Sequence, residues 1–352
     1  MVLEKLRVKF LVISNESPLS IYKFSKKTSS KGVFFLLYKY IKVKIKVKIK
    51  LKRMKSLKNC VKYCIKNYVK DYIDESVWDI ENNIDDDNKE FVLNEVKKFI
   101  EDNYEHININ RCEIVFDWGK NKYVVNCNQS ISLKRTTNQL TNGLFEWRLV
   151  RGDFNCFGCP ITTLEGAPKE VRGSFRCYDC SKLTSLEGAP KEVGMHFNCA
   201  GCRITSLEGA PEKVGNGFRC SQCPIESLEG APGRIGGNFD CSGCKKLKSL
   251  KGAPRKANED FNCANCTGLT SLEGAPKYVG LNFNCSGCSI TSLKGASEYV
   301  DGSFYCSNCP ELKSLQGAPK EVGRNFNCTI CPNLHSLDGI GKVRGGIVRD
   351  VE

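Results

Sequence analysis

Residues 175–196 read FRCYDCSKLTSLEGAPKEVGMH, and variants of this unit recur nine times along the chain. Each copy contains a Cys-x-x-Cys pair, and the first cysteines of successive copies lie 21 or 22 residues apart. The nine pairs contain 18 of the 22 cysteines. A unit this short cannot bury its own apolar side, so successive units must stack on one another. The repeat therefore predicts a solenoid.

Within each unit, Phe stands two residues before the first Cys, and this spacing is typical of a short strand with both side chains pointing inward. Gly-Ala-Pro then turns the chain, because Gly permits unusual dihedral angles and Pro blocks a helix. Free cysteine packs as a small hydrophobic residue. We therefore expect a buried ladder that begins with Phe154, Cys156, Cys159, Phe175, Cys177, Cys180, Phe197, Cys199 and Cys202.

The two copy lengths differ in the bend after the second Cys. Copies of 21 residues carry Ile there, as at Ile204, and copies of 22 residues carry Leu, as at Leu183. A β-branched residue suits extended backbone. We therefore expect a more extended path in the shorter copies and a looser path in the longer ones.

The unit resembles a leucine-rich repeat over residues 151–346. In residues 175–180, Phe and the first Cys fall on the aliphatic positions of that motif, and the second Cys falls on the position of its asparagine ladder. The resemblance implies a β-rich solenoid of the leucine-rich-repeat horseshoe type. It also implies that the exposed strand positions bind another protein.

Cys-x-x-Cys is also a zinc-binding or redox spacing, so two alternatives to a structural role stay open. Cysteines of neighbouring copies could together bind zinc, or could form disulfides between copies. The same pair occurs in every copy without a nearby His, and both cysteines fall on inward positions. We favour a packed thiol core with no metal and no cofactor, and a zinc-binding repeat protein is the alternative function.

The net charge of +14 is concentrated at the start of the chain. Residues 1–53 hold 15 Lys or Arg against two Asp or Glu, whereas residues 151–352 hold 24 against 21. We interpret 1–53 as a poorly ordered basic leader that could contact anionic surfaces, and we expect no nucleic acid on the solenoid. No segment has the roughly 18 apolar residues of a membrane span, and no convincing signal peptide is present. These features favour a cytoplasmic, reducing location.

Residues 54–150 read as a small α+β cap for the solenoid of 151–352. Apolar spacing predicts a helix over 55–74, a short second helix that ends near residue 84, and a third over about 88–104. Two strands follow around 112–116 and 123–125, and 131–150 resemble a degenerate first repeat. Solenoids need such atypical end units.

The resemblance implies a non-enzymatic interaction scaffold, and we expect a monomer. The chain has only three His, and residues 54–150 contain no paired nucleophile and base. Large or charged side chains at outward positions are the candidates for partner contacts, together with one asparagine of the strand row. They are Asn155, Phe157, Arg176, Tyr178, His196, Arg219 and Tyr305. Phe157, Arg176, Tyr178 and Arg219 fall near the N-terminal end and form the most probable contact patch. The alternative is a uniform polar ladder without a specific ligand.

Overall fold

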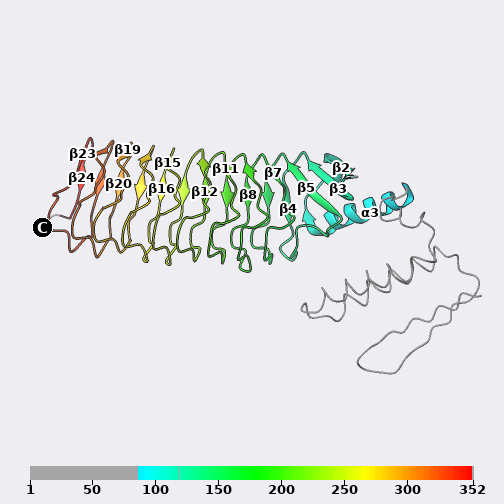
Figure 1. Cartoon of the computed structure of the whole chain (residues 1–352), viewed down its shortest axis with the longest axis horizontal. Coiled ribbons are helices and arrows are strands. Elements are labelled where there is room, and N and C mark those ends of the chain that lie inside the picture. Colours follow the sequence, from blue (N-terminus) through cyan, green and yellow to red (C-terminus); the bar gives the residue numbers. More distant parts are fainter. Residues whose placement is uncertain (1–85, 118, 351–352) are drawn as a thin grey trace, which may run out of the picture. The chain divides into compact units, whose positions relative to one another are not determined.

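A computed structural model describes residues 86–117 and 119–350. They form a β-solenoid of about ten turns, preceded by the helix α3 (Asp86–Asn103) (Figure 1). The predicted helices over 55–74 and up to residue 84, and the basic leader, lie outside the described residues. The solenoid predicted from the repeat is therefore confirmed for the described part of the chain.

Each turn contributes one two-residue strand to each of two sides. The first side is the sheet with the Phe residues: β6 Phe154–Asn155, β8 Phe175–Arg176, β10 Phe197–Asn198, β12 Phe218–Arg219, β14 Phe239–Asp240, β16 Phe261–Asn262, β18 Phe283–Asn284, β20 Phe304–Tyr305, β22 Phe326–Asn327 and β24 Ile347–Val348. The second side holds β7 Glu170–Val171, β9 Glu192–Val193, β11 Lys213–Val214, β13 Arg234–Ile235, β15 Lys256–Ala257, β17 Tyr278–Val279, β19 Tyr299–Val300, β21 Glu321–Val322 and β23 Lys342–Val343. Equivalent residues pair in parallel from turn to turn, as Phe175 does with Phe197.

The second side is interrupted once. On this side, the strands from β7 to β13 belong to one sheet and those from β15 to β23 to another, with no strand pairing between β13 and β15. At this position the side-chain amide of Asn258 donates to the Ile235 carbonyl at 3.0 Å. In the neighbouring turns the corresponding hydrogen bond is donated by a backbone N–H, as from Gly236 to the Val214 carbonyl.

The core is the ladder that the sequence predicts. The nine Phe and Cys residues expected in the first three copies are each at most 2% exposed. Consecutive Phe rings stack with centroids 5.0–5.5 Å apart, from Phe154 to Phe326. Each turn therefore buries its apolar side only against its neighbours, as in other repeat arrays.

The turns stack in a nearly straight row, and a horseshoe is not shown (Figure 1). The curvature of a solenoid arises from a small rotation between repeats. Here both sides of most turns are short strands in parallel register, so both sides advance by nearly the same step. The structure thus shows a β-solenoid, and this architecture alone does not show membership of the leucine-rich-repeat family.

The two copy lengths follow two backbone paths after the second Cys. In the longer copies the Leu N–H closes a turn onto the second Cys, as from Leu183 to the Cys180 carbonyl at 2.9 Å. In the shorter copies no such bond is made at Ile204 or Ile225. The two copy lengths thus differ in this turn, and the more extended path of the shorter copies stays a prediction.

The N-terminal cap closes the first turn of the stack. Helix α3 lies close to the predicted 88–104, and Val96 and Ile100 on it are fully buried. Strands β2 (Cys112–Asp117) and β3 (Lys122–Cys127) form the predicted hairpin and extend the second side. Strand β1 (Tyr104–Glu105) and the 3-10 helix η4 (Ile109–Arg111) complete the cap.

The degenerate repeat of 131–150 forms a true turn. Its strands β4 (Ile131–Leu133) and β5 (Phe145–Val150) pair in parallel with β6 and β7. Gly143 has φ +84°, the left-handed conformation that the glycines of the Gly-Ala-Pro turns adopt. A disulfide joins Cys112 and Cys127 across the hairpin, a pairing that the sequence analysis did not predict.

Candidate interaction surface

The outward strand positions of the first side are dominated by asparagine, and most of these side chains shape the bend that follows. The Asn155 Oδ1 accepts the Phe157 backbone N–H at 3.2 Å. The same contact, at 3.0–3.1 Å, is made by Asn198, Asp240, Asn262, Asn284 and Asn327. Local side-chain bonds of this kind stabilise turns. Asn155 therefore has an architectural role that sequence reasoning missed.

An aromatic stack stands on this surface at its N-terminal end. The rings of Phe157 and Tyr178 lie 5.1 Å apart and 10° from parallel, and both are half-buried. The Arg135 guanidinium carbon lies 4.2 Å from the centroid of the Phe157 ring, on the degenerate first turn. Such cation–π contacts are attractive. Sequence reasoning missed Arg135, because the repeat pattern is lost in residues 131–150.

Arg176 lies beside the stack and is held by Asp153. Its Nη1 contacts the Asp153 Oδ2 at 2.7 Å, and the Asp153 Oδ1 accepts the Ser174 N–H at 2.7 Å. Partial burial raises the pKa of the Asp153 carboxyl, but the Ser174 N–H and the Arg176 guanidinium outweigh this and lower it overall. The ion pair therefore fixes Arg176 on the surface while leaving it partly exposed.

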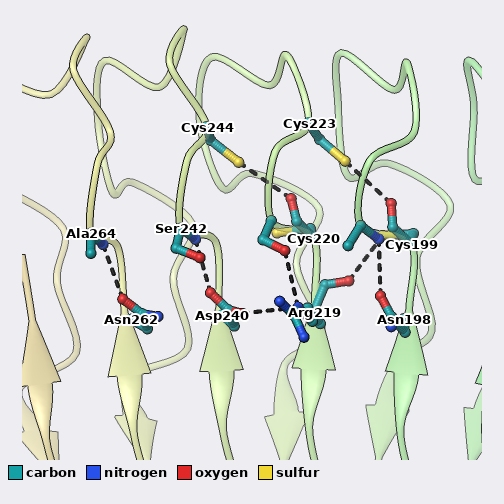
Figure 2. A network of polar contacts seen from close by, with 12 residues as sticks. Asn198, Cys199, Arg219, Cys220, Cys223, Asp240, Ser242, Cys244, Asn262 and Ala264 are labelled. Atoms are coloured by element: carbon teal, nitrogen blue, oxygen red, sulfur yellow. Dashed lines mark hydrogen bonds and ion pairs between the residues drawn. The ribbon is translucent and has the colours of Figure 1, made fainter. Parts of the chain in front are cut away.

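Arg219, on β12, is also held by an aspartate of a neighbouring turn. Its Nε lies 3.1 Å from the Asp240 Oδ2 and donates to the Ser221 Oγ at 3.0 Å (Figure 2). Ser221 is only 2% exposed. The Arg219 side chain is therefore held close to Ser221 and toward Asp240.

The structure brings together only part of the predicted set. Asn155, Phe157, Arg176 and Tyr178 come from two adjacent turns, and Arg219 lies two turns beyond Arg176. His196 is exposed before β10, where its Nδ1 accepts the Gly217 N–H at 3.3 Å.

Tyr305 is separate from this group. It lies on β20, six strands from β8, or roughly 29 Å at ~4.8 Å per strand. The residues Arg135, Phe157, Arg176 and Tyr178 are named the N-terminal patch below.

The paired cysteines form a second ladder, which is internal. In eight successive turns the second Cys donates its thiol to the carbonyl of the first Cys one turn earlier, at 3.0–3.5 Å. Figure 2 shows this contact from Cys223 to Cys199 and from Cys244 to Cys220. Burial raises the pKa of the Cys285 and Cys306 thiols well above the usual value. The thiols of Cys285 and Cys306 are thus held in the protonated form inside the core.

The remaining chemistry of the described residues is limited. Within 86–117 and 119–350, no three His, Cys, Asp or Glu side chains are arranged to hold a metal ion. In the same ranges no helix has the length and apolar character needed to cross a membrane.

Compared with known proteins, the chain matches no protein-family model, no curated protein and no solved structure.

Proposed function

We propose that the protein is a non-enzymatic scaffold that binds another protein through the first side of its solenoid, at the N-terminal patch. The observation that carries the proposal is the stacked, half-exposed pair of Phe157 and Tyr178 beside Arg176. Aromatic residues and arginine are the side chains most often responsible for binding energy in protein interfaces. Later turns present mainly asparagine and small residues on the same side.

Two features of the patch support binding. The Arg135 contact and the Asp153 ion pair hold the side chains in place before a partner arrives, so less conformational entropy is lost on association. The surface also lies on paired strands of a fully packed stack, which is a rigid support. We further propose that the protein acts as a monomer.

Affinity capture with the full chain tests the proposal. Wild type is compared with the double variant Arg176→Ala/Tyr178→Ala, and with the control Tyr299→Ala/Arg324→Ala. The control residues are exposed and lie near the other end of the solenoid. We expect proteins retained by wild type and by the control to be lost with the patch variant. Equal retention by all three chains contradicts the proposal.

We also propose that the turns are variant leucine-rich repeats. The support is the contact of the second Cys with a backbone carbonyl, which is the role that the resemblance assigns to asparagine at that position. An amide N–H is a stronger donor than a thiol. If the proposal is right, Cys244→Asn keeps more stability in urea unfolding than Cys244→Ala. If asparagine is the more damaging replacement, the family assignment loses its support.

A further inference from the structure

The aromatic stack belongs to a row of side chains that immediately follow the first Cys of each turn. After Phe157 and Tyr178, this row continues with small residues only. They are Ala200, Ser221, Ser242, Ala264, Ser286, Ser307 and Thr329. The stack therefore stops after two rings. The face of the Tyr178 ring that points toward the next turn has no ring upon it, because that turn offers the methyl group of Ala200.

A carboxylate borders the open ring face. Asp179 adopts a left-handed conformation with φ +56°, and its Oδ1 occupies the space that a Cβ on Gly201 would need. Gly201 follows Ala200 directly, so this oxygen lies against the turn that carries Ala200. The Asp179 backbone N–H donates to the Ala200 carbonyl at 2.8 Å, whereas its exposed carboxylate makes no hydrogen bond or ion pair within the described part of the chain. A free acceptor is thus present at the edge of the open ring face.

The turn that follows Ala200 carries Arg219 next to the same row of side chains. Ser221 is the next member of the row after Ala200, and the Arg219 Nε donates to its hydroxyl. Tyr178 and Ser221 are two turns apart, which is roughly 10 Å at ~4.8 Å per turn. Adjacent rings in this protein stack at 5.0–5.5 Å. The interval between Tyr178 and Arg219 therefore accommodates one planar group.

We propose that the space over Ala200 is a subsite for a single aromatic side chain of the partner, either tryptophan or tyrosine. The inference rests on the proposed function. The incoming ring stacks on Tyr178 and continues the ladder by one member. Its indole N–H or phenol O–H donates to Asp179, which distinguishes it from phenylalanine.

The other end of the stack supports this assignment. There the Arg135 guanidinium lies against the open face of Phe157, so the ladder already ends on a cation in one direction. An aromatic ring over Ala200 lengthens this ladder to three rings, with the Arg135 cation on the face of its first ring.

The test uses random 12-residue peptides displayed on phage and selected on the full chain. Enriched peptides are then synthesised, and their Kd values are measured by fluorescence anisotropy. Two variants of the protein form a matched pair. Ala200→Phe places a ring of the protein's own in the proposed subsite, where it stacks as Phe157 does. Ser286→Phe makes the same kind of change in a later turn that also has Asn at the strand position and Gly after the ring row.

We expect the enriched peptides to share a tryptophan or tyrosine. Ala200→Phe and Tyr178→Ala should each weaken binding about tenfold or more, whereas Ser286→Phe should change it less than about twofold. Asp179→Ala should weaken peptides that contain Trp or Tyr by several-fold. The same variant should have little effect on a peptide in which that residue is replaced by Phe. Circular dichroism and thermal unfolding check that each variant is folded.

Three results refute the subsite: no enriched peptide, enriched peptides without a shared aromatic residue, or binding that survives Ala200→Phe. The proposed function is tested separately by affinity capture. If captured partners survive Ala200→Phe and are lost with Arg176→Ala/Tyr178→Ala, the subsite is wrong and the scaffold proposal stands. If capture is insensitive to both changes, both proposals fail.

Discussion

Cys241 and Cys244 belong to the same turn and allow the thiol ladder to be tested by a matched pair of substitutions. Both side chains are 0% exposed. The Cys244 thiol donates to the Cys220 carbonyl at 3.3 Å, and this is the only hydrogen bond found for that carbonyl. The Cys241 thiol donates to no backbone carbonyl. Replacing either residue by alanine removes the same atoms from the same core, but only Cys244→Ala leaves a carbonyl unpaired.

The expected difference follows from these contacts. Losing a buried sulfur costs about 1 kcal/mol or more in both variants, through lost burial and the small cavity that remains. An unpaired buried carbonyl adds ~1–3 kcal/mol, and the lower half of that range applies because a thiol is a weak donor. We therefore expect Cys244→Ala to be about 1–2 kcal/mol less stable than Cys241→Ala.

Urea unfolding followed by circular dichroism, under reducing conditions, measures both variants beside wild type. Repeat arrays need not unfold in a single step. Placing both substitutions in one turn makes them report on the same local unit, so their difference remains interpretable. If the two variants are equally destabilised, the thiol ladder is packing alone and its hydrogen bonds add nothing. The structural reasoning about the second Cys would then be refuted.

Three further outcomes are expected. Phe239→Ala should lower the free energy of unfolding in urea by ~3–5 kcal/mol, because it removes a buried ring that is stacked on both sides. Tyr299 is 44% exposed, so Tyr299→Ala should lower it by under ~1 kcal/mol, and similar losses in the two variants would contradict the ladder. Burial raises the pKa of the Cys328 thiol from 9.0 to about 11, so this thiol should add no pH dependence to stability below pH 9. Between pH 9 and 11, where only the unfolded thiol ionises, it should lower stability by at most ~1.4 kcal/mol per pH unit, and unfolding curves at pH 9 and 10 that coincide would contradict this. Gly230→Ala should lower the melting temperature strongly, because Gly230 has φ +87° and an added Cβ would lie 2.6 Å from the Glu208 nitrogen. An added Cβ on Gly233 meets no atom within 4 Å, so Gly233→Ala should leave the melting temperature unchanged or raise it slightly, and equal effects of the two changes would refute the turn geometry.

Much of the solenoid could be predicted from the repeat because its causes are local or periodic. The spacing of Phe175 and Cys177 puts both side chains on one side of a strand, and the same spacing in every copy makes them stack. The one-residue difference between copies predicted the two bends at Leu183 and Ile204 because chain length limits the path directly.

The candidate site was predicted less completely. Phe157, Arg176 and Tyr178 could be identified as unusual residues at outward positions. Their contacts could not, because Arg176 meets Asp153 and Phe157 meets Arg135 only through the register between turns. Asn155 was assigned to binding because an exposed asparagine in a sequence gives no sign that its oxygen closes a turn.

The sequence by itself determined the period, the inward ladders and the positions of the turns, since a short unit with one apolar side can be buried only by stacking on its copies. The tertiary structure decided the near-straight stacking, the interruption at Asn258 and the Cys112–Cys127 pairing. It also decided which outward side chains are used within the fold and which, like Asp179, are left without a partner. These features depend on how side chains from separate turns or strands meet in space, and such encounters are fixed only when the backbone positions of both are known.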